Sequence, residues 1–156
     1  MYYFVLSNNF IGQKQDTHKI TLKNLKSYLL TFEFEDEIKI KWLNSDNFEC
    51  YVFMYKEIIK DLVVTNLFKE EPEVYDYTVE QNRIEFNDLK LNTFEEFNVI
   101  FEYGIDSDMK SDDLVVDIDE KIYVFNSIYN NPIEYKYLHE VLDDFENRIT
   151  EVRDAF

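Results

Sequence analysis

Hydrophobic and polar residues alternate with period two along most of the first two thirds of the chain, which is typical of half-buried β-strands. Ile38, Ile40 and Trp42, for example, alternate with Lys39 and Lys41. The pattern predicts single strands over residues 2–6, 48–55, 74–79, 83–91 and 97–103, and hairpins over 32–42 and 114–124. Residues 21–30 and 56–69 fit a short helix as well as a strand, so both alternatives stay open for them.

Charge supports the first predicted hairpin, 32–42. Its first arm carries Glu33 and Glu35, and its second arm carries Lys39 and Lys41. Opposite charges on facing strands stabilise an antiparallel pair. The sequence therefore predicts that these glutamates face these lysines.

The C-terminal residues change to helical spacing. Asn131 is a suitable N-cap, Pro132 suits the first helical position, and Glu134 is placed to complete a capping box. We expect a helix over 132–154. Its apolar stripe consists of Tyr137, Leu138, Val141, Phe145, Ile149, Val152 and Phe156, and its opposite face carries Glu140, Asp143, Asp144, Glu151 and Asp154.

These elements predict an α+β fold: a mainly antiparallel β-sheet packed by a long C-terminal amphipathic helix. A sandwich and a barrel are the alternatives for how the sheet curls. The 156 residues fit a single domain, and a composition that is 46% hydrophobic and 17% aromatic argues for a firmly folded core.

The net charge of −17 divides the chain into two unequal halves. Residues 1–69 carry nine acids and nine lysines, whereas 70–156 carry 24 acids and seven basic residues. We expect one domain over 1–156 with a charge-balanced first half and a strongly acidic second half. Net charge influences association and partner choice, so the sequence predicts a basic partner.

The composition excludes several classes of protein. Gly12 and Gly104 are the two glycines, too few for a Walker A loop, a dinucleotide-binding fingerprint or a serine-hydrolase elbow. Cys50 is the single cysteine, so no intrachain disulfide can form. No apolar run is long enough to cross a membrane and the first seven residues lack a basic signal segment, so a soluble cytoplasmic protein is expected.

The acidic stretch after residue 105 invites comparison with a calcium loop. In that register Asp106, Asp108 and Asp117 would occupy ligand positions one, three and twelve. Lys110 then falls at position five, where a ligand is needed, and Ser111 at position six, where glycine makes the turn. We therefore expect a solvated acidic loop and no metal site.

No catalytic residue and no cofactor is predicted. A nuclease-like pair such as Glu134 and Lys136 arises by chance in so acidic a chain, and an acidic surface repels phosphates. Cys50 lies in an alternating strand, where a buried and inert thiol is expected. The histidines, His18 and His139, complete no recognisable catalytic arrangement with it.

The function we expect from the sequence is that of a non-catalytic acidic binding protein. It would neutralise a basic, nucleic-acid-processing protein by occluding its active or nucleic-acid-binding site, as a toxin-immunity or phage anti-defence inhibitor that mimics nucleic acid. A metal-dependent enzyme using the 106–120 carboxylates and an assembly subunit with an aromatic oligomer interface are the alternatives. The expected partner-binding residues are Asp106, Asp108, Asp112, Asp113, Asp117, Asp119, Glu120, Glu140, Asp143, Asp144, Glu151 and Asp154. We expect no direct contact with nucleic acid or a membrane.

Overall fold

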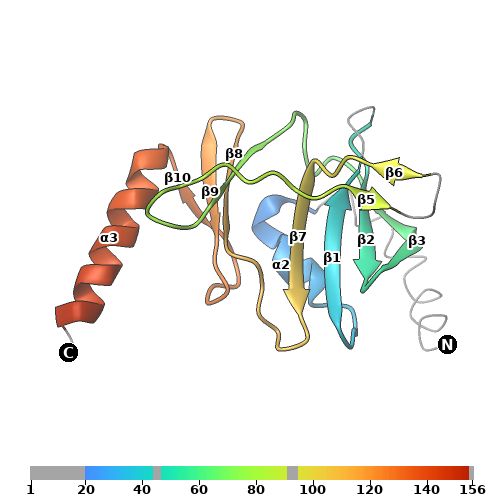
Figure 1. The fold of residues 1–156 in the computed structure, drawn as a ribbon, viewed down its shortest axis with the longest axis horizontal. Helices are drawn as coiled ribbons and strands as arrows, with labels where there is room; N and C mark the ends of the chain where they lie inside the picture. The colour runs from blue at the N-terminus through green and yellow to red at the C-terminus, as the bar shows by residue number, and fades with distance from the viewer. Residues whose placement is uncertain (1–19, 44–46, 91–94, 155–156) are drawn as a thin grey trace.

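The structure is a computed structural model that describes residues 20–43, 47–90 and 95–154. Sheet A has four antiparallel strands, in the spatial order β3 (Glu57–Val64), β2 (Cys50–Met54), β1 (Glu37–Trp42) and β7 (Phe101–Asp106). Sheet B has four more, in the order β10 (Ile133–Tyr135), β9 (Lys121–Phe125), β8 (Leu114–Ile118) and β4 (Glu73–Asp76). A two-stranded sheet pairs β5 (Leu89–Lys90) with β6 (Glu96–Phe97), and the helices are η2 (Leu22–Asn24), α2 (Leu25–Leu29) and α3 (Leu138–Asp154) (Figure 1).

One hydrophobic core joins the two large sheets. Alternation in β1 turns Ile38, Ile40 and Trp42 inward, and none of the three retains solvent-accessible surface. Leu25 and Leu29 of α2 are equally buried in this cluster, which also contains inward residues of β8 and β9. Burial of apolar surface from both sheets and α2 therefore holds these elements together.

Strand β8 is buried on both of its faces. Leu114 and Val116 belong to the core shared with sheet A, whereas Val115 points to the opposite face of sheet B. There it packs with Val124 of β9 and Val141 of α3. This explains why the sequence of β8 reads as a nearly continuous apolar run.

A buried lysine connects α2 to the loop between β9 and β10. Lys26 is only 5% exposed, and its Nζ donates hydrogen bonds to the carbonyl oxygens of Ser127 (3.1 Å) and Tyr129 (3.0 Å). Desolvation lowers the pKa of Lys26, and the nearby Asp113 carboxylate opposes that shift. The two carbonyl groups compensate for burial of the ammonium group.

The predicted α+β fold with a long helix packed on the sheet is wrong. The described chain is mostly antiparallel β-structure, and α3 begins at Leu138 instead of residue 132. Residues Ile133–Tyr135 form β10 instead, because they pair with β9 at the edge of sheet B. The Glu140 carboxylate caps the later start by accepting a hydrogen bond from the Tyr137 backbone N–H at 3.0 Å.

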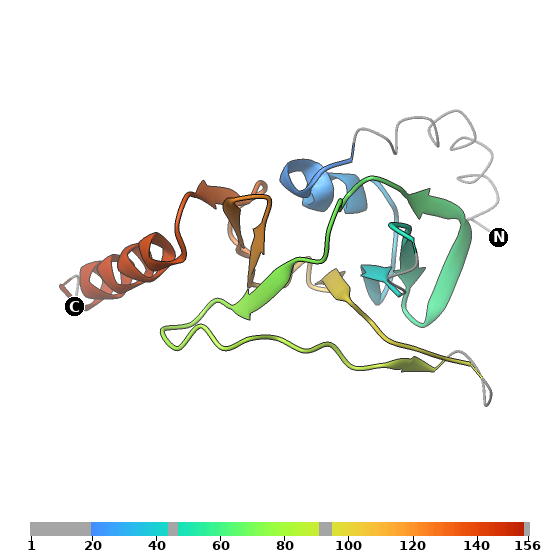
Figure 2. The same ribbon diagram turned by 90° about the horizontal axis from the view of Figure 1, so that it is seen from above.

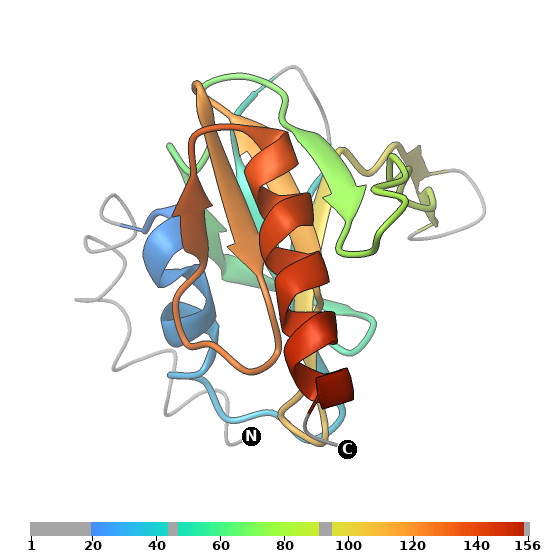
Figure 3. The ribbon, with the colours of Figure 1, turned by 90° about the vertical axis from the view of Figure 1, so that its left-hand side faces the viewer.

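Helix α3 contacts sheet B through its first turns and does not form a layer over it. Val141 joins the small cluster on the outer face of the sheet, and the ring of Phe145 packs edge-on against Tyr77 at 5.1 Å. Figure 2 shows α3 at one end of the molecule, beyond sheet B, and Figure 3 shows it in front of that sheet from this end. The shared core lies on the other face of sheet B.

The structure confirms some of the predicted strands and changes the bounds of others. The 114–124 hairpin is confirmed as β8 and β9, and the strands expected over 48–55 and 74–79 are confirmed as β2 and β4 with shorter bounds. The open segment 56–69 contains β3, and 21–30 contains η2 and α2. Of the strand expected over 83–91, only β5 and an isolated bridge at Arg83 are present. The strand expected over 97–103 is divided between β6 and β7. The strand expected over 2–6 lies outside the described residues.

The predicted 32–42 hairpin is wrong, because only its second arm is a strand. Residues 31–36 turn before β1, and β1 pairs with β2 and β7. Lys39 and Lys41 therefore meet Glu102 of β7, at 3.4 Å and 3.3 Å, instead of Glu33 and Glu35. The lysines of β1 do face a carboxylate, as expected, but it belongs to a strand about sixty residues later in the chain.

Candidate functional site

Acidic side chains gather at the end of sheet B where β8 turns into β9. In the β4–β8 register, Glu73 lies directly opposite Asp117, and like charges in this position destabilise a strand pair. Desolvation raises the pKa of Asp117, and the carboxylates of Glu73 and Glu70 raise it further. Glu70 is therefore close enough to add to the same negative field.

The turn between β8 and β9 brings two more acids to this point. The Asp119 backbone N–H donates a hydrogen bond to Glu70 Oε1 at 3.3 Å, which joins the turn to the segment before β4. Asp119 and Glu120 both have left-handed backbone conformations, with φ of 55° and 58°. Two-residue hairpin turns require this geometry, although asparagine and glycine adopt it more readily. We call Glu70, Glu73, Asp117, Asp119 and Glu120 the hairpin-tip acids.

The hairpin-tip acids have little compensation from basic side chains. Arg83 lies 3.7 Å from Glu73, and both side chains are more than half exposed, so this pair contributes little. Within the described part of the chain, no ion pair joins the other four to a lysine or arginine. Lys121 closes the same turn and Lys69 precedes Glu70 in the sequence, so the five acids of the tip outnumber the basic residues around them.

The acids predicted over 106–120 do not form one continuous surface. Asp113 and its neighbours precede β8, whereas the hairpin-tip acids lie at its other end, about 17 Å away for a five-residue strand. Asp106 Oδ1 accepts hydrogen bonds from the backbone N–H groups of Asp108 (2.9 Å) and Lys110 (3.0 Å). This carboxylate therefore shapes its own loop.

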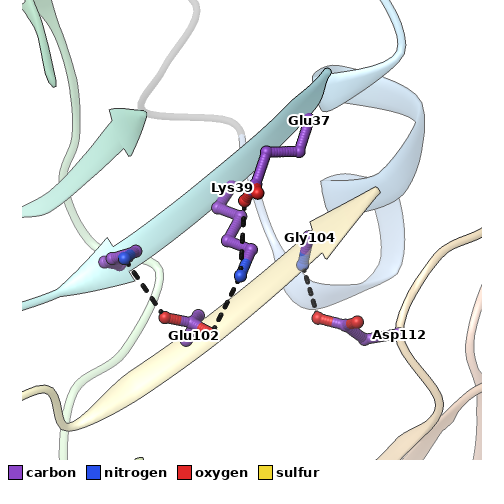
Figure 4. A network of polar contacts seen from close by, with 6 residues as sticks. Glu37, Lys39, Glu102, Gly104 and Asp112 are labelled. Atoms are coloured by element: carbon purple, nitrogen blue, oxygen red, sulfur yellow. Dashed lines mark hydrogen bonds and ion pairs between the residues drawn. The ribbon is translucent and has the colours of Figure 1, made fainter. Parts of the chain in front are cut away.

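Two further carboxylates of this segment connect it to other strands. Asp112 Oδ2 accepts a hydrogen bond from Gly104 N–H at 2.9 Å, as Figure 4 shows, and Asp113 Oδ1 accepts one from Ser127 N–H at 2.7 Å. Desolvation raises the pKa of Asp112, while the bond from Gly104 and the charge of Lys39 oppose the rise. Both acids therefore stabilise the fold locally, whatever else they bind.

Some of the α3 acids also accept hydrogen bonds within the protein. Glu140 caps the helix, and Asp144 accepts a hydrogen bond from the Tyr135 hydroxyl, whereas Asp143 is exposed. Glu151 and Asp154 lie in the last turns of the helix, where side chains are outside the described part. The structure thus places the α3 acids on a separate element from the hairpin tip.

Sequence reasoning missed Glu70 and Glu73. Glu73 directly precedes the strand expected over 74–79, and its register against β8 could not be read from the sequence. Glu70 reaches the tip by a contact that spans 49 residues. The change in charge balance at residue 70 was the one signal that pointed to this segment.

The Cys50 thiol lies in the core, whereas His139 is exposed at the start of α3. Cys50 is fully buried, which confirms that part of the prediction, and desolvation raises the pKa of its thiol to about 12. His139 stacks on Tyr137 with ring centroids 5.5 Å apart, and His18 lies outside the described residues. Among the residues that the structure describes, no three His, Cys, Asp or Glu side chains are arranged so that they could hold a metal ion.

Comparisons with known proteins give no assignment. The chain matches no protein-family model, no curated protein and no solved structure. Within the described ranges, no helix is both long enough and apolar enough to span a lipid bilayer.

Proposed function

We propose that this protein is a non-catalytic acidic binding protein that neutralises a basic, nucleic-acid-processing protein. Its acidic surface would occupy the partner's active or nucleic-acid-binding site, in the manner of a toxin-immunity or phage anti-defence inhibitor acting in the cytoplasm. The observation that carries the proposal is the group of hairpin-tip acids, which outnumber the basic residues around them and of which only Glu73 forms an ion pair within the described residues.

The arrangement has a cost for the isolated protein. Cross-strand acids such as Glu73 and Asp117 repel each other, and Glu120 occupies a left-handed turn position that glycine adopts more readily. A cationic groove on a partner would convert this repulsion into attraction. Electrostatic complementarity of this kind mainly accelerates association and selects the partner.

The density of charge supports mimicry of a phosphate backbone. Side chains directly opposite each other in an antiparallel pair lie about 4.5–5.5 Å apart at Cβ, and Glu73 and Asp117 are such a pair. Each DNA strand carries one phosphate per about 3.4 Å of helix axis. The Cβ atoms of this pair are therefore spaced on the same scale as successive phosphates of a DNA strand.

The proposal is tested with a triple variant at the tip, Glu73→Gln, Asp117→Asn and Glu120→Gln. Immobilised wild-type protein should capture a basic protein at low salt, and the purified partner should lose nucleic-acid binding or cleavage when this chain is added. The triple variant should associate at least ten times more slowly at low salt, because electrostatic steering is reduced.

The matched control removes three exposed acids from the first half of the chain: Glu33→Gln, Glu57→Gln and Asp61→Asn. It carries the same net charge as the tip variant and should bind like the wild type. Equal weakening by both triple variants would show that only total charge matters and would contradict a site at the tip. A captured partner that keeps full activity in the complex would contradict neutralisation.

A further inference from the structure

A cavity of about 410 Å³ opens beside the hairpin tip. Its walls come from η2, from the segment between β3 and β4, and from the β8–β9 hairpin. These three pieces of chain are far apart in sequence, so the cavity exists only in the folded protein. It lies on the face of sheet B that carries the shared core, because Ile118 and Tyr123 point to that side.

The floor of the cavity is apolar. Leu22, Leu67 and Ile118 line it, and each is less than a tenth exposed. The half-buried ring of Tyr123 forms part of the same wall. Such a surface can cover the methylene stem of a long side chain while leaving its charged end near solvent.

Two carboxylates stand at the cavity. Glu70 and Asp119 both line it, and the hydrogen bond from Asp119 N–H to Glu70 Oε1 holds the Glu70 carboxylate beside the turn. Desolvation raises the pKa of Tyr123, Glu134 and Asp119 raise it further, and Lys23 opposes the rise. An aromatic face and two carboxylates around one apolar floor are the groups that bind a guanidinium ion.

The cavity also contains two lysines, but one of them is compensated. Lys23 Nζ lies 3.0 Å from Glu134 Oε1, so its charge is matched by a carboxylate outside the cavity. Lys69 is exposed. Asp117 and Glu73 lie on the opposite face of sheet B. With Lys23 matched by Glu134, the charges left in the lining are the carboxylates of Glu70 and Asp119 and the ammonium group of Lys69.

We propose that this cavity binds an arginine side chain of the basic partner. The stem would lie on Leu22, Leu67 and Ile118, and the guanidinium group would contact Glu70 and Asp119 beside the ring of Tyr123. Arginine fits better than lysine, because its planar fork can bond two carboxylates and stack on an aromatic face. The inference rests on the proposed function, since it names the group through which the partner would be held.

The test uses nuclear magnetic resonance of the full chain with N-acetyl-L-arginine amide as the probe. Saturable shifts should appear at Leu67, Ile118 and Tyr123, with a dissociation constant in the millimolar range for so small a ligand. The neutral analogue N-acetyl-L-citrulline amide should bind at least ten times more weakly. The lysine analogue should bind more weakly than arginine but more tightly than citrulline.

A double variant, Glu70→Gln and Asp119→Asn, should weaken arginine binding at least tenfold. Asparagine tolerates the left-handed backbone at position 119, so this variant should fold. The control, Glu57→Gln with Asp61→Asn, removes the same charge from exposed positions of β3 and should bind arginine like the wild type.

Three results would overturn the inference: shifts that do not saturate, equal binding of citrulline, or equal loss in the control variant. The outcome is separable from that of the proposed function. If arginine fails to bind but the basic partner is still captured and neutralised, the cavity is not the site and the function stands. If arginine binds as described but no basic partner is neutralised, the cavity site stands and the function is wrong.

Discussion

Sheet A and sheet B place charged side chains on antiparallel strands in the same way, yet with opposite electrostatic results. On β1 and β7, Lys39 lies 3.3 Å from Glu37 and 3.4 Å from Glu102, and Lys41 lies 3.3 Å from the same Glu102 (Figure 4). On β4 and β8, Glu73 lies opposite Asp117. The first arrangement compensates its charges internally, whereas the second leaves them for another molecule.

Desolvation lowers the pKa of Lys39, but Glu102 and Glu37 together raise it above its ordinary value. For Asp117, desolvation and the neighbouring acids act in the same direction and raise its pKa. Charge removal should therefore weaken sheet A and strengthen sheet B. This difference separates charges that stabilise the fold from charges that are available for binding.

The largest effect is expected from Gly104→Ala in β7. An added Cβ would lie 2.5 Å from Lys39 Cγ and 3.1 Å from the Ile38 carbonyl oxygen, so Lys39 must move away from its carboxylates. Overpacking of this kind costs about 1–3 kcal/mol of unfolding free energy. Urea unfolding measures the loss, and a variant as stable as the wild type would show that the compensated network tolerates displacement.

Glu102→Gln should destabilise the protein by about 1 kcal/mol, because it removes the shared acidic partner of Lys39 and Lys41. The loss should shrink at high salt, since screening weakens the ion pairs in the wild type. Glu57→Gln, an exposed change in the same sheet, serves as the control and should leave stability within about 0.5 kcal/mol. Equal effects of the two changes would remove the distinction between paired and unpaired acids.

Glu120→Gly should stabilise the protein by about 0.5–1 kcal/mol, because glycine adopts the left-handed backbone at φ 58° without steric cost. This stabilised variant should also associate more slowly with the basic partner, because it lacks one of the charges of the tip. Stability and binding would then change in opposite directions, as the contrast between the two sheets requires. Thermal unfolding and association kinetics are measured on the same sample. A destabilised Glu120→Gly would contradict the account of a strained turn.

The smallest effect is expected from Asp117→Asn, which should stabilise the protein at neutral pH by about 0.5 kcal/mol through loss of the like-charge pair. The folded pKa of Asp117 is raised, so its penalty is complete above that pKa and disappears as pH falls toward the unfolded value. The advantage of the variant over the wild type should therefore be present at pH 7 and lost near pH 4. A pH-independent difference, in urea unfolding at both values, would contradict this.

Local alternation predicted strands well where both partners were close in sequence. Residues 114–124 form the expected hairpin, because Val116 and Ile118 alternate with Asp117 and Asp119 and the turn is only two residues long. The same reasoning failed for Phe32, which is buried in the core from a turn instead of a strand. Apolar character marked it for burial, but period two alone did not distinguish the two backbones.

The C-terminal helix shows the limit of capping signals. Asn131, Pro132 and Glu134 satisfy the preferences for a helix start, yet β10 forms there and Tyr137 with Glu140 caps the helix instead. Pairing with β9 extends the backbone hydrogen bonds of sheet B. A local sequence pattern cannot predict this pairing, because it depends on a neighbouring strand. Of the described α3 acids, Asp143 is exposed, whereas Glu140 and Asp144 accept hydrogen bonds within the protein. Two of the five hairpin-tip acids, Glu70 and Glu73, come from a segment that the sequence analysis did not select.

The amino-acid sequence alone indicated a β-rich chain, a buried Cys50 and a negative charge concentrated after residue 69, because alternation, hydropathy and charge are local properties. Only the tertiary structure decided which acids meet. Glu102 pairs with Lys39 and Lys41, and Glu70 meets Asp119, through contacts that span 63 and 49 residues. Strand register is set by burial of apolar faces from distant segments, so the division between compensated and available charge emerges only when the sheets pack.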